Sequence, residues 1–336
     1  MWGNSRTKRQ HFKLLSVYLA VVNLKPTKIK GVCCYSLLAG WLLCPNILKS
    51  QDITSPRFFK LNVQSLSAPS RLISEEGDAL RAGDRESNYI VEGQLRFPIK
   101  LSGRTKLIGQ VDYDRETVFG LYAENENEGE DFTFNNLSSA IIGIHDIDDQ
   151  WSYFSRLKVQ NGAERLFPFH TKGLNGNFSN FFQKRTKDGL VGIGFQVSYN
   201  RRVTVLPVVK WEKRLDNGWG FDISLPQQIL INKQFSQSNR WYAGLKGSRS
   251  GYFFRDELRD ISSDLYYRRI TVNAVLGVEK QLTSLIGLMA EVGATRPLRS
   301  GVYVYNGPWE KLHDFNEGIA PYVKFGLFLS VNKKSI

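Results

Sequence analysis

Side chains that could perform nucleophilic or metal chemistry are few in this sequence and form no known catalytic or metal-binding pattern. All three cysteines, Cys33, Cys34 and Cys44, lie within residues 1–50. Of the four histidines, none stands at zinc-ligand spacing from another. A nucleophile elbow, a P-loop and a dinucleotide fingerprint are also lacking. We therefore predict no metal site, no cofactor and no enzymatic activity.

Charged residues recur instead at alternate positions within apolar stretches. Successive side chains of a β-strand point to opposite faces, so this pattern gathers the charges on one face. In a closed barrel they would face the interior, where they either border a narrow aqueous path or brace the lumen as salt bridges. Both signs occur, which predicts no strong ion selectivity. The candidate lumen-facing residues are Glu92, Arg96, Asp112, Arg156, Lys158, Lys210, Glu212, Asp222, Lys246, Arg269, Glu279, Glu291 and Lys324.

A period of two, typical of β-strands, dominates the sequence from Phe58 onward. In residues 89–100, Val91 and Leu95 share one face, and Glu92 and Arg96 share the other. Most segments run for ~9–12 residues, the length that a tilted strand needs to cross a bilayer. About twelve segments of this kind begin near Phe58, Tyr89, Thr105, Leu137, Trp151, Leu190, Val203, Trp219, Arg240, Tyr267, Ser284 and Pro321.

Long and short connections alternate between these segments. The short ones are 101–104, 146–150, 200–202, 232–239 and 281–283, and the long ones are 66–88, 115–136, 160–189, 248–266 and 296–319. One connection, 213–218, breaks the alternation. Outer-membrane barrels have short periplasmic turns and longer extracellular loops. We therefore predict an all-β fold, a closed antiparallel transmembrane β-barrel of about 12 strands (10 or 14 also fit), with both termini on the periplasmic side.

Large aromatic residues lie near the ends of several expected strands. Tyrosine and tryptophan concentrate at bilayer interfaces because a ring with a polar tip suits that layer. Aromatic residues in the core of a soluble β protein would give a similar pattern. The expected interfacial residues are Trp151, Tyr153, Trp211, Trp219, Trp241, Tyr266 and Tyr267.

The first 50 residues differ from the rest of the chain. They hold eight of the 45 basic and none of the 32 acidic residues, so the remainder is close to balanced and gives no reason to expect a nucleic-acid partner. Lys25, Lys28 and Lys30 precede an apolar run over 31–43, the pattern of a secretory leader. We expect a leader over residues 1–50 and a single barrel domain over 51–336.

The final segment carries a short pattern of polar, glycine and apolar positions. Lys324, Gly326, Leu329 and Val331 occupy these four places. The pattern resembles the signal by which barrel-assembly machinery recognises a closing strand. It differs from the usual bacterial form because it does not end on Phe or Trp, and five residues follow Val331.

Two stretches, from Trp219 to Tyr252 and from Val278 to Pro297, resemble a family of functionally uncharacterised, porin-like outer-membrane barrels from Bacteroidota. The resemblance implies a bacterial outer-membrane location and lipid contact, and no activity. A passive channel for small solutes is the function we expect. The alternatives are a plugged structural or surface-binding barrel without transport, and a soluble β-sandwich binding module.

Overall fold

The computed structural model describes residues 57–67, 87–101, 103–118, 132–167, 171–200, 202–236, 238–255, 264–304, 310–314 and 318–330. All of these residues lie in one compact unit, which spans 54–335. The expected leader over residues 1–50 lies outside the described residues. No helix among the described residues is both long and apolar enough to cross a membrane.

Fifteen β-strands and one short 3-10 helix make up the regular structure of the described residues. Their bounds are β1 (Arg57–Ser67), β2 (Ser87–Lys100), β3 (Thr105–Val118), β4 (Phe132–Asp146), β5 (Trp151–Ala163), η2 (Thr171–Gly173), β6 (Leu174–Thr186), β7 (Gly189–Asn200), β8 (Arg202–Arg214), β9 (Trp219–Leu225), β10 (Gln228–Ser236), β11 (Asn239–Arg255), β12 (Asp264–Gln281), β13 (Ile286–Val304), β14 (Glu310–Asp314) and β15 (Ala320–Ser330).

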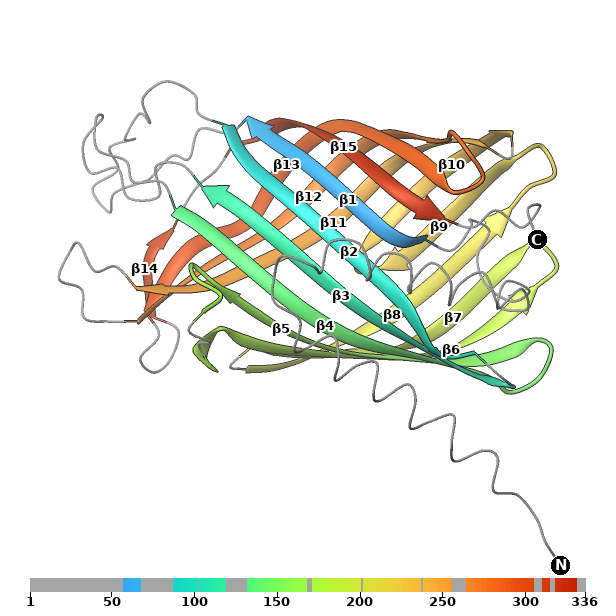
Figure 1. Ribbon diagram of the computed structural model, residues 1–336, viewed down its shortest axis with the longest axis horizontal. Helices are drawn as coiled ribbons and strands as arrows, with labels where there is room; N and C mark the ends of the chain where they lie inside the picture. The colour runs from blue at the N-terminus through green and yellow to red at the C-terminus, as the bar shows by residue number, and fades with distance from the viewer. Residues whose placement is uncertain are drawn as a thin grey trace, which may run out of the picture. The chain divides into compact units, whose positions relative to one another are not determined.

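The strands form one closed antiparallel barrel (Figure 1). Each strand from β1 to β13 pairs with the next, and β15 closes the wall between β13 and β1. In the closing seam, Leu61 pairs with Leu327 and Gln64 pairs with Lys324. The short strand β14 pairs only with β13 and adds nothing to the wall. The barrel wall therefore has fourteen strands.

The main expectation of twelve strands is wrong, and fourteen, one of its alternatives, is correct. Strand β6 was assigned to a long loop because its outward positions include Gly176 and Asn180 while its inward positions include Phe181. Strand β10 was merged with β9 because only residues 226–227 separate the two. Each error omits one strand, so the two together account for the difference between twelve and fourteen.

The two ends of the barrel differ in the length of their connections. One end, here called the short-turn end, carries 101–104, 147–150, 187–188, 215–218, 237–238 and 282–285. The opposite end carries 68–86, 119–131, 164–173, 256–263 and 305–319, together with two brief connections at 201 and 226–227. The apparent exception at 213–218 therefore belongs to the short-turn end, and the true exceptions are 201 and 226–227. Strands β1 and β15 respectively begin and end at the short-turn end, where Arg57 pairs with Ser330.

The turn at 147–150 shows how the short connections are fixed. The Asp148 carboxylate accepts the backbone N–H groups of Trp151 and Gln150, each at 2.7 Å. These two hydrogen bonds hold the pKa of Asp148 below its usual range.

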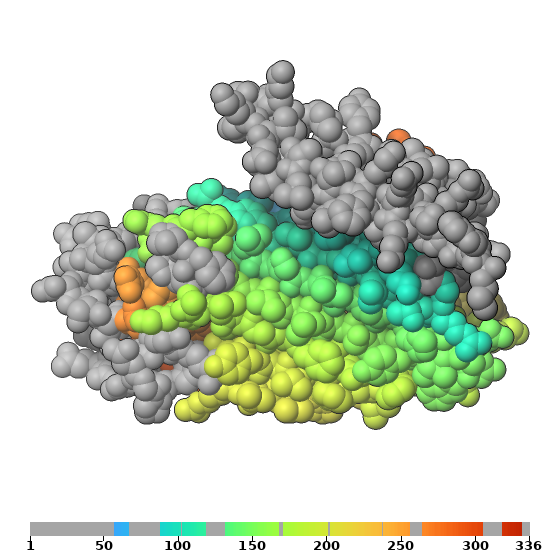
Figure 2. Space-filling model, turned by 60° about the horizontal axis from the view of Figure 1, so that its bottom comes forward, coloured from blue at the N-terminus to red at the C-terminus, as the bar shows by residue number. Residues whose placement is uncertain are grey.

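The outward face of the barrel is apolar. Large side chains such as Leu157, Phe182 and Ile193 are exposed there, and Ile193 keeps 68% of its surface accessible. Figure 2 shows this outer face over β2 to β8 as a continuous wall of side chains. One sheet whose apolar side faces outward is not a sandwich of two sheets with an inner core, so the soluble β-sandwich is excluded.

Four tryptophans lie exposed on the outer face near the short-turn end, namely Trp151, Trp211, Trp219 and Trp241. The interfacial assignment of Tyr266 and Tyr267 is wrong, because each is only 1% exposed. These two tyrosines lie near the start of β12, in a part of the wall that folds inward.

Strand β11 extends beyond its neighbour β10. Strand β10 begins at Gln228, opposite Lys246 of β11, so residues 247–255 extend beyond it while remaining paired with β12. Near the tip of this extension, Phe253 pairs in parallel with Ala163 of β5. Five strands, β6 to β10, lie between β5 and β11 along the wall. The extended part of β11, with the part of β12 that pairs with it, therefore crosses the lumen at the end opposite the short turns.

Glycines allow this crossing. A Cβ atom at Gly162 of β5 would lie 2.5 Å from the carbonyl oxygen of Gly251 in β11, which is closer than any normal contact. The backbone N–H of Glu164 donates to the carbonyl oxygen of Phe253 at 3.1 Å. Two backbones can approach this closely only where side chains are absent.

An aromatic cluster fills the space beneath the crossing. Phe134 of β4 is fully buried, and its ring stacks on those of Tyr252 and Tyr267 at centroid distances of 4.9 and 5.4 Å. Burial of apolar surface therefore holds the hairpin against β3 and β4. The cluster comprises Val118, Phe132, Phe134, Tyr252, Phe254, Leu265, Tyr267 and Val302.

Adjacent residues on β7 test which face meets lipid. Phe195 faces outward, whereas Gln196 faces the lumen and receives a hydrogen bond there from Gln227. We expect Phe195→Arg to lower the free energy of unfolding in lipid vesicles by about 2–4 kcal/mol, and Gln196→Arg by much less. Urea titration of both variants makes the comparison. A larger loss for Gln196→Arg would mean that the faces are assigned the wrong way round.

Candidate functional site

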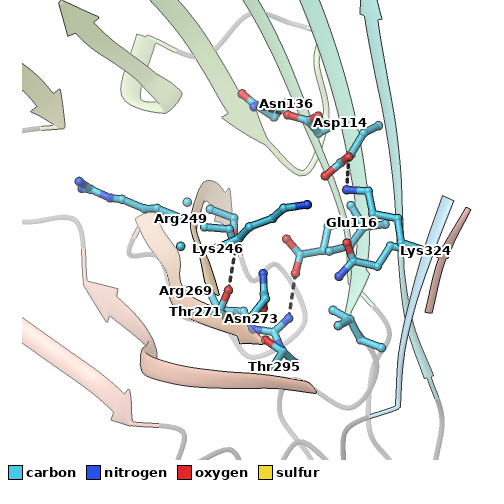
Figure 3. A pocket seen from close by; sticks show the side chains of 18 of the residues that line it. Asp114, Glu116, Asn136, Lys246, Arg249, Arg269, Thr271, Asn273, Thr295 and Lys324 are labelled. Atoms are coloured by element: carbon cyan, nitrogen blue, oxygen red, sulfur yellow. Dashed lines mark hydrogen bonds and ion pairs between the residues drawn. The ribbon is translucent and has the colours of Figure 1, made fainter. Parts of the chain in front are cut away.

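A polar cavity of about 460 Å³ lies inside the barrel. Its walls come from β1 to β5, from β10 to β13 and from β15. Figure 3 shows Asp114 and Asn136 on one wall with Lys246 and Arg249 on another. Ten charged residues line it: Lys60, Glu92, Asp114, Glu116, Lys158, Lys246, Arg249, Arg269, Glu291 and Lys324.

A buried ion pair marks the boundary between this cavity and the aromatic cluster. Arg269 of β12 donates from Nη1 to Oε1 of Glu116 at 3.2 Å, and both side chains are almost fully buried. The hydroxyl of Tyr252 donates to the other oxygen of Glu116 at 2.9 Å. Glu116 thus links β3 to the two strands that cross the lumen.

A second carboxylate, Glu291 of β13, gathers three donors. The hydroxyls of Tyr242 and Tyr322 donate to it at 2.7 and 2.8 Å, and Lys246 forms an ion pair with it. Both tyrosines are buried and pack in a smaller cluster with Leu66, Leu230 and Val275. Apolar packing therefore fixes the hydroxyls that orient Glu291.

The remaining cavity carboxylates are also engaged. Lys324 donates to Glu92 at 2.5 Å, and the side-chain amide of Asn62 donates to the same oxygen at 2.7 Å. Asn136 donates to Asp114 at 3.0 Å. Every acidic residue that lines the cavity thus has at least one donor.

Other candidate residues form separate clusters along the lumen. Asp112 lies 3.4 Å from Lys158 and 3.9 Å from Arg156. Glu279, near the short-turn end, binds Arg57 at 2.6 Å and Arg240 at 3.7 Å. In each of these two clusters, two basic side chains approach the same carboxylate.

The remaining candidate residues each have a polar partner within the lumen. Lys210 pairs with Glu212 at 2.8 Å. Asp222 accepts a hydrogen bond from Gln228 at 2.9 Å, and Arg96 donates to Gln110 at 3.0 Å. The structure thus gathers Glu92, Lys158, Lys246, Arg269, Glu291 and Lys324 at the cavity and disperses the others.

Sequence reasoning left four charged residues of the cavity out of the candidate set. Asp114 and Glu116 continue the alternate spacing of Asp112, but Glu116 fell within an expected loop. Lys60 shares the face of Asn62 and Gln64 on β1, and could have been found by the same period of two. Arg249 lies in the inward extension of β11, which the sequence pattern did not reveal.

Among the described residues, no group of three or more His, Cys, Asp or Glu side chains is arranged to hold a metal ion. His145 lies at the short-turn end, where its Nδ1 is 2.9 Å from the hydroxyl of Thr105.

Removing one member of the buried Glu116–Arg269 pair tests how much the pair contributes to the free energy of unfolding. Arg269→Met leaves the Glu116 carboxylate buried without its arginine, so we expect a loss of about 3–5 kcal/mol in the free energy of unfolding. The double variant Glu116→Leu/Arg269→Met should recover most of this loss, because no uncompensated charge remains. Lys210→Met, in a more exposed pair, is the matched control, with an expected loss of about 1 kcal/mol or less. Equal losses for the two single variants would show that the Glu116–Arg269 pair has no special role.

Comparisons with known proteins find only distant structural similarity. No family model and no curated protein matches the chain. Among solved structures, an outer-membrane channel from Pseudomonas putida F1 has 9% identity and a TM-score of 0.42, covering 83% of this chain and 99% of its own. A Pseudomonas aeruginosa FadL homologue has 10% identity and a TM-score of 0.42, covering 82% and 90%. The Pseudomonas putida toluene transporter TodX has 8% identity and a TM-score of 0.34, covering 82% and 89%. The closed barrel follows from the strand pairing itself, and structural similarity at this level assigns the chain neither a role nor a solute.

Proposed function

We propose that the chain is a bacterial outer-membrane protein whose barrel is a narrow passive channel for small polar solutes. The observation that carries this proposal is the polar cavity of about 460 Å³ inside a wall whose outer face is apolar. About eight strands give a barrel that side chains alone can fill, so fourteen leave room for water.

The lumen-facing side of β6 and β7 supports a path for solutes. Apart from Arg185, which pairs with Asp146 near the short-turn end, its inward side chains are uncharged. Asn177 forms hydrogen bonds with both Ser179 and Ser198, and all three remain partly exposed. Opposite them lie the ion pairs of the cavity. An uncharged polar wall facing a charged wall suits a hydrated solute that is not held tightly.

The crossing of β11 and β12 limits how wide such a path can be. The aromatic cluster and the Glu116–Arg269 pair occupy lumen space at the end with the long connections. A channel built this way passes small molecules and excludes large ones.

The same crossing also favours a second candidate, a plugged barrel without transport. Its observation is the near-complete burial of Glu116, Arg269 and Phe134, which indicates dense packing across part of the lumen. The two candidates differ in one measurable property, the ionic conductance of the purified barrel.

Conductance in planar bilayers distinguishes the two candidates. We expect the unmodified protein to give small, steady conductance steps and Phe134→Ala to give larger ones, because truncation removes the centre of the aromatic cluster. Phe182→Ala, on the outer face, is the matched control and should leave the conductance unchanged. The truncation should also cost about 3–5 kcal/mol of stability, so folding is checked by heat-modifiable gel mobility. Conductance only in Phe134→Ala would favour the plugged barrel, and none in either protein would contradict the channel.

We further infer that the last strand carries an assembly signal read by barrel-assembly machinery. Supporting this, Lys324, Gly326 and Leu329 lie in β15, the strand that pairs with β1 at the closing seam. Val331 lies outside the described residues. The inferred export leader over residues 1–50 delivers the chain to the same machinery.

A substitution in β15 tests the assembly signal. Leu329→Asp places a charge at an apolar position of the closing strand, so we expect less folded barrel and more unfolded chain in the periplasm. Lys334→Asp, beyond the pattern, is the control and should assemble normally. The ratio of folded to unfolded bands on a cold gel measures the effect. Normal assembly of Leu329→Asp would show that β15 does not carry the assembly signal.

A further inference from the structure

The basic side chains of the cavity are not all matched by carboxylates. Six basic and four acidic residues line it. Lys246, Lys324 and Arg269 each bind a carboxylate, and Lys158 approaches Asp112. Within the described part of the chain, Lys60 and Arg249 form no hydrogen bond and no ion pair.

Lys60 is the more informative of the two. It lies on β1, its side chain is partly buried, and it lines the cavity. The cavity carboxylates cannot easily turn to it, because Lys324 and Asn62 hold Glu92, and Lys246, Tyr242 and Tyr322 hold Glu291. A partly desolvated ammonium group that forms no direct ion pair is unfavourable, so an anion at this point would be stabilised.

We propose that the cavity binds a small anionic solute through a carboxylate or phosphate oxygen, with Lys60 as its main contact. The proposal rests on the channel function and names the class of solute that the channel prefers. It also replaces the expectation of no strong ion selectivity, since pairing neutralises the acidic residues and leaves basic ones in excess.

Arg249 extends the proposed site along the cavity wall. It lies on the inward extension of β11, is exposed, and points away from the Glu116–Arg269 pair (Figure 3). The cavity lining also includes uncharged polar side chains, among them Gln64 and Gln228, that can exchange hydrogen bonds with a solute. Arg249 thus provides a first contact and Lys60 a deeper one.

Binding to the detergent-folded full-length protein tests the proposal separately from transport. Isothermal titration at low ionic strength uses inorganic phosphate, acetate and tetramethylammonium as probes. We expect phosphate or acetate to bind and tetramethylammonium not to bind. Whichever anion binds more tightly identifies the preferred oxygen chemistry. Lys60→Met should weaken anion binding by about tenfold or more, the usual effect of losing one charge-assisted hydrogen bond.

Three further variants complete the test. Lys60→Arg keeps the charge and should retain binding, and Arg249→Gln should weaken it by a smaller factor. Lys184→Met removes an outward-facing lysine that lies over Trp151 and should leave binding unchanged. Unaltered affinity in Lys60→Met, or no anion binding by the unmodified protein, overturns the proposal. Anion binding without conductance would support this site and contradict the channel. Conductance without anion binding would support the channel and contradict this site.

Discussion

For a barrel in the membrane location proposed above, the structure depends on one constraint, that a sheet within a lipid layer cannot leave a strand edge unpaired. Each unpaired backbone group there costs several kcal/mol, so the sheet must close on itself. The pairing of β15 with β1 performs this closure. Because alternate side chains then point inward and outward, the period of two in the sequence becomes an apolar outside and a polar inside.

Closure leaves a second physical problem, because fourteen strands enclose more space than their own side chains fill. The β11–β12 hairpin solves part of it by crossing to β5 at one end of the lumen. Two interactions of different kinds hold the crossing in place. The aromatic cluster supplies apolar burial, and Glu116, bound by Arg269 and Tyr252, fixes the position of the strands.

Much of the fold could be predicted from local sequence, because strand alternation is a local property. Strand β6 escaped detection because Gly176 and Asn180 interrupt its apolar face, and β10 because its hairpin turn is only two residues long. Which charged residues face the interior could also largely be predicted from their spacing. Their pairing could not be, since Glu116 and Arg269 are 153 residues apart and meet only through the crossing. The inward burial of Tyr266 and Tyr267 depends on the same long-range event.

The central claim is that the polar face of the wall borders water while the apolar face borders lipid. Cysteine labelling in reconstituted vesicles tests it directly, because Cys33, Cys34 and Cys44 are the only native cysteines and can be replaced by serine. Ser198→Cys reports the lumen side of β7 and Ile193→Cys the outer side. We predict that a charged, membrane-impermeant thiol reagent labels Ser198→Cys much faster than Ile193→Cys. Labelling of Ile193→Cys with protection of Ser198→Cys, or equal labelling of both, would contradict the account.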